Sequence, residues 1–209
     1  FKPVAIVAEK AEASNKDVEF IKRALNLEEP VELLCPISLS NKDFLASVND
    51  KEPAWLQKAE RAYAKVSQGK EVILVEGVSG FKRGTDQTIA GSITVKALGA
   101  KAILVANYES KLQASQIVEA AEVLAGYLLG VIINAVPQRR MESVKATLVK
   151  SVEQSRIKVL GTLPEDRTLL SISVGELAEL LGGSIINSAE SSDNLVEAVM
   201  VGAMSPDPA

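Results

Sequence analysis

The 209-residue chain contains no histidine and one cysteine, and aromatic residues make up only 4% of it. Without histidine it cannot build a Ser-His-Asp triad, a Cys-His pair or a zinc site with histidine ligands. The single cysteine, Cys35, cannot form an internal disulfide, and we expect it to be a small buried core residue. Any chemistry must therefore use lysine, carboxylates, backbone amides or a metal ion held by oxygen. Enzymes that act on nucleotide phosphates use this set of groups.

The sequence also lacks a long apolar run and a concentration of charge of either sign. No stretch reaches the roughly 20 residues that a transmembrane helix requires, and no signal-peptide pattern opens the chain. The net charge is −4, with lysine and arginine scattered, which argues against a nucleic-acid surface. We therefore expect a cytoplasmic protein with no membrane span and no nucleic-acid partner. Hydrophobic residues make up 47% of the chain, enough for one sizeable core and a small appendage.

Short apolar runs alternate with amphipathic patterns of helical period along most of the chain. The runs predict strands at residues 3–8, 72–75, 102–106, 129–134 and 157–160, with a weaker one at 184–187. Strands that alternate with helices are joined by right-handed crossovers into a parallel sheet. The fold class that we expect is α/β, with three layers and a mostly parallel sheet.

The most informative of these runs is 72–75, which Glu76 and a glycine loop follow. An uninterrupted apolar run is typical of a strand covered on both faces, and ligands bind beyond the carboxyl ends of such strands. One interpretation is that Glu76 holds a magnesium ion, directly or through water, while Gly77 and Gly80 let the backbone approach a ligand closely. A surface acid in a tight turn explains the same residues equally well.

Two segments depart from the alternation. Residues 28–54 are interrupted by prolines, and we expect an irregular excursion over the top of the sheet that shapes a pocket. From residue 169 to 209 the pattern changes to that of a second, small module. There Ser173 and Glu176 fit a capping box that opens a helix. The apolar residues expected to face inward from this helix are Leu177, Leu180 and Leu181.

Four short motifs together resemble the dethiobiotin-synthetase-like branch of P-loop proteins. They are FKPV at 1–4, LVEGVSG at 74–80, GVIINAVP at 130–137 and LGTLPEDR at 160–167. Their order and spacing are most similar to the domain at the amino end of long phosphate acetyltransferases, also labelled cobyrinic acid a,c-diamide synthase-like. A DRTGG domain follows it there. On this resemblance, residues 1–168 form the P-loop-type domain and residues 169–209 the opening half of a DRTGG domain.

The resemblance implies a nucleotide site spread over these motifs. In the family, the lysine of the Lys-Pro segment neutralises an anionic substrate near the transferred phosphate, and Lys2 matches it. The acid of the Val-Glu-Gly motif helps to place magnesium, which here is Glu76. The asparagine that closes the Gly-Val-Ile-Ile-Asn strand of the third motif reads the adenine edge, which here is Asn134. The further nucleotide-binding residues implied are Gly77, Gly80, Leu163, Pro164 and Glu165.

Each of these residues also has a plainer explanation, and the sequence leaves both open. Lys2 fits a solvated lysine, and Asn134 fits an asparagine that satisfies backbone amides at a strand end. Pro164 and Glu165 fit an ordinary turn before the next module. The Arg139-Arg140 pair fits either a contact with a phosphate or acidic partner or a solvated helix start.

The sequence departs from the family in lacking the Gly-x-x-x-x-Gly-Lys-[Ser/Thr] phosphate loop. In the family that loop lies before the Lys-Pro segment, which here means before Phe1. Without the amides and lysine of the loop, we expect neither tight ATP binding nor phosphate transfer by these residues alone. Apolar residues 5–8 also replace the small polar residues of the synthetases, so dethiobiotin synthetase activity is not expected.

Three functions fit these observations. The leading hypothesis is a regulatory or assembly module of phosphate acetyltransferase type, with a nucleotide effector, acting as a homo-oligomer or within a larger assembly. The second is an ATP-dependent ligase or synthase that uses ATP and Mg²⁺ and has its phosphate loop upstream. The third is a scaffold subunit that docks through the apolar stretch 195–204. Because the sequence starts inside an expected strand, we also expect it to be a fragment, a processed product or the ordered part of a longer protein.

Overall fold

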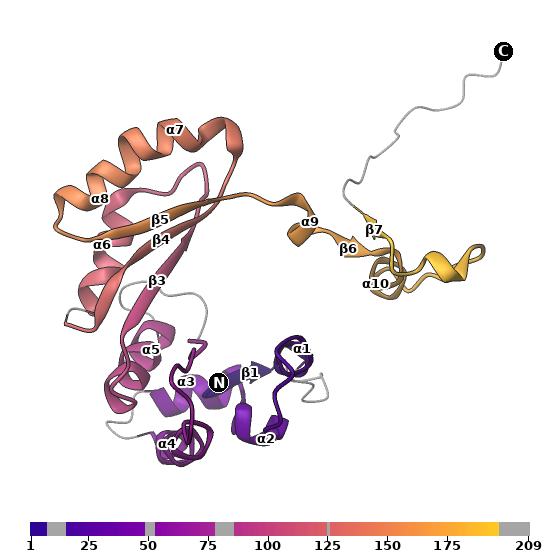
Figure 1. Ribbon diagram of the computed structural model, residues 1–209, viewed down its shortest axis with the longest axis horizontal. Coiled ribbons are helices and arrows are strands. Elements are labelled where there is room, and N and C mark those ends of the chain that lie inside the picture. Colours follow the sequence, from indigo (N-terminus) through magenta and orange to yellow (C-terminus); the bar gives the residue numbers. More distant parts are fainter. Residues whose placement is uncertain (8–15, 49–52, 78–85, 125, 197–209) are drawn as a thin grey trace.

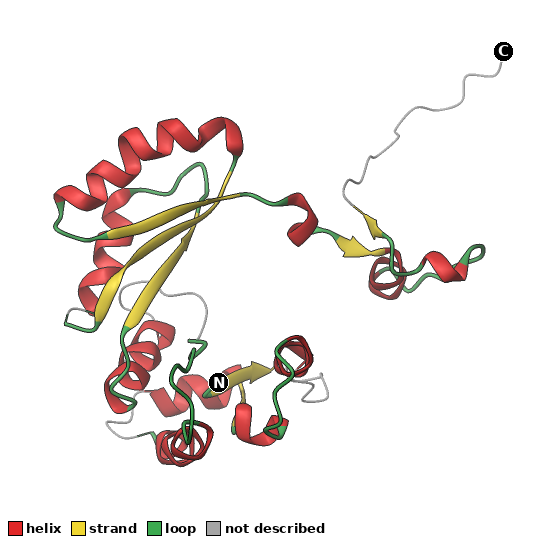
Figure 2. Ribbon diagram, in the orientation of Figure 1, coloured by secondary structure: helices red, strands yellow, loops and turns green. Residues whose placement is uncertain are grey.

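A computed structural model describes residues 1–7, 16–48, 53–77, 86–124 and 126–196. These residues form an amino-terminal lobe (1–97), a central lobe (102–164) and a carboxyl-terminal annex (167–196), in the order of the sequence (Figure 1). The strands fall into three separate groups, and the longest of them lie in the central lobe (Figure 2). The fold is α/β with parallel pairing in both lobes, which confirms the predicted fold class.

The amino-terminal lobe is built around two short parallel strands. In it β1 (Val4–Val7) pairs with β2 (Ile37–Ser40). Its helices are α1 (Lys16–Ala24), α2 (Val31–Leu34), α3 (Asn41–Val48), α4 (Ala54–Val66) and α5 (Asp86–Ala97). Phe44 and Trp55 fill the core between these strands and helices, because the apolar positions of α3 and α4 face the sheet.

Strand β2 lies within the segment for which the sequence predicts an irregular excursion, and that prediction is wrong for residues 37–48. Pro36 comes directly before the strand, where a missing amide costs no bond of the ladder. The segment therefore supplies a strand and a helix of the lobe. Cys35 is buried in the second core of the lobe, as predicted.

The central lobe is a three-stranded parallel sheet in the order β3-β4-β5. The strands are β3 (Ala102–Asn107), β4 (Leu128–Val136) and β5 (Val159–Pro164). Two helical segments lie on the same side of this sheet (Figure 1). They are α6 (Ala114–Val123) and a continuous run of η1 (Gln138–Arg140), α7 (Met141–Val144), the π-helical turn η2 (Lys145–Val149) and α8 (Lys150–Gln154). The predicted strands at 102–106 and 129–134 are confirmed, and the one predicted at 157–160 begins two residues later.

One face of the central sheet is well packed. Leu104, Val131 and Val152 meet the apolar face of α6 there. The close approach of β4 to β5 requires Gly130, because a Cβ atom there would lie 2.6 Å from the carbonyl oxygen of Lys158. On the opposite face Val105 is 55% exposed.

The annex is a small α/β unit reached through β5. Its elements are α9 (Arg167–Leu170), β6 (Ile172–Ser173), α10 (Val174–Leu180), η3 (Ala189–Ser191) and β7 (Leu195–Val196), with β6 and β7 antiparallel. The predicted capping box is confirmed, since the Ser173 hydroxyl accepts from the Glu176 amide and the Glu176 carboxylate accepts from the Ser173 amide. The predicted inward apolar face is wrong for Leu180 and Leu181, which are exposed, whereas Leu177 is half-buried. Residues 184–187 form no strand, so that weaker prediction is also wrong.

The run 72–75 is not a strand covered on both faces, and this prediction too is wrong. The side chains of Val72 and Leu74 are 78% and 81% exposed. The run does lie parallel to the start of the chain, because the Phe1 amine donates to the Leu74 carbonyl and the Glu76 amide donates to the Phe1 carbonyl. Val72 and Leu74 lie on the same face of the run, and it is this face that is exposed, whereas Ile73 and Val75 on the other face are half-buried.

No helix in the described ranges is long and apolar enough to cross a membrane.

Candidate functional site

A cluster of one lysine and two carboxylates lies in the amino-terminal lobe. The Lys2 ammonium is 3.1 Å from Glu76 Oε1 and 2.5 Å from Asp17 Oδ2. The Lys2 side chain is 16% exposed, whereas those of Asp17 and Glu76 are 62% and 46% exposed. The structure thus brings together two residues that the family resemblance assigns to one site, and it gives Lys2 partners instead of solvent.

Three different segments position this cluster. The Lys2 amide donates to the Leu34 carbonyl, just before β2, which fixes the backbone beside the sheet. Glu76 is held beside the start of the chain because its backbone amide donates a hydrogen bond to the Phe1 carbonyl. Asp17 lies in the first turn of α1, where the helix dipole favours an acid. The sequence analysis did not include Asp17 among the site residues. The signal that could have identified it is an acidic residue at the start of the helix that follows β1.

Charge pairing decides the protonation of the cluster. Burial by itself lowers the pKa of Lys2, but hydrogen bonds and charge from Asp17 and Glu76 outweigh it, so the pKa of Lys2 is raised. The hydrogen bond from Lys2, followed by a backbone hydrogen bond, lowers the pKa of Asp17. The ammonium and the Asp17 carboxylate therefore both remain charged over the whole neutral range.

The carboxyl ends of β3 and β4 carry a pair of asparagines. Asn134 and Asn107 are register partners, and the Asn134 side-chain amide donates to Asn107 Oδ1 at 3.1 Å. The next residue, Ala135, has a left-handed φ of 56°, which is uncommon for a residue other than glycine and coincides with an irregularity in the register between β4 and β5. Sequence reasoning missed Asn107, although it ends a predicted strand next to that of Asn134.

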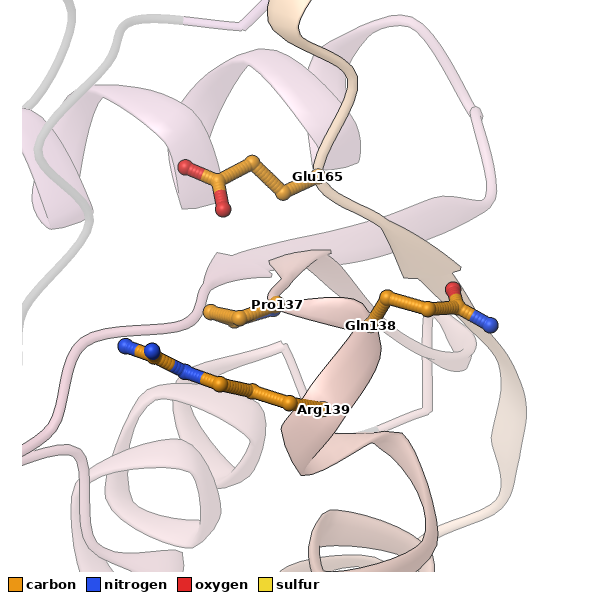
Figure 3. A pocket seen from close by; sticks show the side chains of 4 residues that line it. All are labelled: Pro137, Gln138, Arg139 and Glu165. Atoms are coloured by element: carbon orange, nitrogen blue, oxygen red, sulfur yellow. The ribbon is translucent and has the colours of Figure 1, made fainter.

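A cavity of about 370 Å³ lies beside these strand ends, lined by Pro137, Gln138, Arg139 and Glu165. Figure 3 shows the Glu165 and Arg139 side chains extending to the same side of Pro137, while Gln138 points away from them. The Glu165 amide donates to the Val136 carbonyl, which ties the loop after β5 to the end of β4.

The predicted site residues therefore fall into two groups. Lys2 and Glu76 lie in the amino-terminal lobe, whereas Asn134 and Glu165 lie at the strand ends of the central lobe. Among the described residues, no hydrogen bond or ion pair joins the two groups. Leu163 and Pro164 are exposed and do not line the cavity, and Gly77 has open space around its Cα. Gly80 lies outside the described residues.

The two carboxylates near Lys2 are the oxygen ligands that a magnesium ion prefers. They are too few for a complete protein cage, and no group of three or more metal-binding side chains occurs in the part of the chain that the structure describes. Magnesium usually keeps several waters and takes only one or two carboxylates together with substrate phosphates. Asp17 and Glu76 fit that mode of binding.

Comparison with known proteins identifies the family. A family model described as an AAA domain matches residues 1–173. The chain belongs to this AAA domain family. A phosphate acetyltransferase from Pseudomonas putida is 24% identical over 214 residues, which cover 96% of this chain and 30% of that protein. The AAA domain therefore spans less than a third of the length of this curated relative.

The match supports a P-loop-type, nucleotide-binding class of domain with distant similarity to phosphate acetyltransferase. All the predicted site residues of this AAA domain, from Lys2 to Glu165, fall within the matched range. The match continues to residue 173, where β6 ends. It thus includes both lobes and the first two elements of the annex, α9 and β6.

Proposed function

We propose that residues 1–168 form a nucleotide-binding regulatory or assembly domain of phosphate acetyltransferase type, which binds MgATP but does not turn it over with these 209 residues alone. The observation that supports this most is the Lys2 ammonium held between Asp17 and Glu76. A lysine kept charged and largely buried at such a place offers a fixed positive group for a phosphate, and the carboxylates offer oxygens for Mg²⁺.

Each predicted residue takes a role in this proposal. Lys2 neutralises phosphate charge, and Glu76, assisted by Asp17, places the metal ion through its carboxylate oxygens. Asn134 holds the base at the end of β4, where its side-chain carbonyl and amide match the adenine edge. The loop 163–165 forms the side of the base pocket, with Glu165 at the cavity. Bound magnesium would neutralise charge on the phosphates.

The annex has a separate role in the proposal. We assign residues 169–209 to the opening half of a DRTGG domain that links the nucleotide domain to further parts of a homo-oligomer or larger assembly. Its supporting feature is apolar exposure, since Leu169, Leu180 and Ile186 are 84%, 77% and 97% exposed. The cytoplasmic location and the absence of a nucleic-acid partner remain predictions from the sequence.

Variants of the full natural polypeptide test the nucleotide site. In isothermal calorimetry with MgATP, we expect Lys2→Met and Glu76→Gln to weaken binding about tenfold or more, because each removes a charge-assisted contact. Lys70→Met is the matched control: Lys70 also forms an ion pair in this lobe, 2.8 Å from Glu29, but takes no part in the cluster. If all three variants bound MgATP with the same affinity, the result would contradict the proposed site.

An ATP-dependent ligase or synthase is the second candidate, and the pairing of Lys2 with Glu76 favours it. Phosphoryl transfer needs a positive group and a metal-placing acid at one place. Steady release of phosphate by the full polypeptide on addition of a carboxylic acid substrate, abolished by Lys2→Met, would favour this candidate over a regulatory domain.

A further inference from the structure

Two side-chain amides meet where β3 and β4 end. Asn107 is the last residue of β3, and its register partner on β4 is Asn134. The Asn134 Nδ2 group donates to Asn107 Oδ1 at 3.1 Å, and the Tyr108 backbone amide donates to the Asn134 carbonyl at 2.8 Å. The two strand ends are thus joined through both side chain and backbone. In open parallel sheets, ligands bind at this edge.

The contact between the asparagines decides how the Asn134 side chain presents its two polar groups. A side-chain amide carries an acceptor oxygen and a donor nitrogen on one carbon, and a half-turn about the last side-chain bond exchanges them. Because Asn107 on β3 engages Nδ2, the Oδ1 atom of Asn134 is turned away from β3. Within the described residues this oxygen accepts no hydrogen bond, so it is available to a ligand.

An acceptor oxygen held in one direction discriminates between ligands by their chemistry. It accepts from an amino group on a purine ring, as in adenine, and it repels a carbonyl oxygen at the same ring position, as in hypoxanthine. A freely rotating amide would offer its nitrogen to the carbonyl oxygen and would serve both bases. Discrimination therefore depends on the orientation of the Asn134 amide as well as on its presence.

We propose that Asn107 is a positioning residue of the nucleotide site. By accepting a proton from Asn134 Nδ2, it fixes Asn134 Oδ1 as the acceptor for the amino group of the base. The site is thereby selective for adenine over purines that carry an oxygen in place of that amino group. Asn107 acts through Asn134 and does not contact the base. This inference rests on the proposed nucleotide-binding function.

Calorimetry of the full natural polypeptide with MgATP and with magnesium inosine triphosphate tests the proposal. The wild type should bind ATP about tenfold more tightly or better, because inosine triphosphate loses one hydrogen bond and brings two acceptors together. Asn107→Leu cannot accept a hydrogen bond, so the freed amide should reduce this ratio to about threefold or less. Asn107→Asp still accepts and should keep the ratio of the wild type.

The outcomes separate this inference from the function on which it rests. If the wild type bound neither nucleotide, the nucleotide site and this inference would both fail. If ATP bound but Asn107→Leu lowered both affinities equally, Asn107 would have a structural role alone and only this inference would fail. A lost preference for ATP in Asn107→Asp would also overturn it, because a carboxylate that only accepts must meet the Asn134 nitrogen.

NMR of the full natural polypeptide with isotope-labelled asparagine, without nucleotide, supplies a second readout. Of the two protons on Asn134 Nδ2, the one bonded to Asn107 should exchange with solvent about threefold more slowly or better. The difference should persist in Asn107→Asp and vanish in Asn107→Leu. Equal exchange of the two protons in the wild type would contradict the contact that fixes the amide.

Discussion

Strand β4 in the central lobe and the run 72–76 in the amino-terminal lobe have similar apolar sequences, but they differ in burial. Val131, Ile133 and Val136 in β4 have no exposed surface, whereas Leu74, in an equally apolar run, is 81% exposed. In the central lobe β4 has a strand on each side and helices on one face. In the run 72–76 the face that carries Val72 and Leu74 is exposed. Burial of an apolar strand is therefore decided by what packs on its faces, not by its own composition.

The largest expected effect comes from comparing equivalent truncations in the two runs. Ile133→Ala should reduce the free energy of unfolding of the 209-residue chain by about 3 kcal/mol, because it leaves a cavity in a packed core. Leu74→Ala should cost about 0.5 kcal/mol or less, as for an exposed position. Urea unfolding followed by circular dichroism measures both. Similar costs for the two variants would show that the run 72–76 is buried after all.

A smaller difference between the two lobes is expected in the coupling energy of their ion pairs. A double-mutant cycle with Lys2→Met and Asp17→Asn should give a coupling energy of about 1 kcal/mol, since Lys2 is largely buried while Asp17 is exposed and screened. The control cycle uses Lys145→Met and Glu142→Gln, an exposed pair in the central lobe. Its coupling should be about 0.3 kcal/mol. If the control coupled as strongly, burial of Lys2 would contribute nothing.

The smallest effect is the pH dependence of the same cluster. The pKa of Asp17 is lower in the folded state, so its stabilising contribution is complete above the unfolded pKa of about 4 and is lost as the pH falls through the folded pKa. The raised pKa of Lys2 keeps its contribution complete at all pH values below about 10. The Tm difference between the wild type and Asp17→Asn should be constant from pH 5 to 9 and shrink below pH 4. A difference that persisted at pH 2 would exclude the ion pair as its cause.

The strands of the central lobe could be predicted from sequence because their partners follow one another along the chain. The predicted runs 102–106 and 129–134 each find a parallel neighbour within the described residues. The exposure of the run 72–75 could not be predicted, since the composition of a run does not show which of its faces another element covers. The run 184–187 is short, and no strand among the described residues pairs with it.

The candidate site could be predicted in part. The family motifs single out Lys2 and Glu76, which the structure places 3.1 Å apart. A site role for Asp17 could not be predicted, because an acid in the first turn of a helix is common. Only the folded chain shows that Asp17 forms an ion pair with Lys2. The sequence singles out Arg139 only together with Arg140, and its place beside Glu165 at the cavity depends on how the loop after β5 returns to β4.

Calorimetry and phosphate release with MgATP test the central claim most directly, that these residues hold only part of a nucleotide site. The 209-residue chain should bind MgATP weakly and release no phosphate, while the full natural polypeptide should bind it at least about tenfold more tightly, because the remaining phosphate contacts are restored. Rapid ATP turnover by the 209-residue chain alone, or equal affinity in the two proteins, would contradict the account.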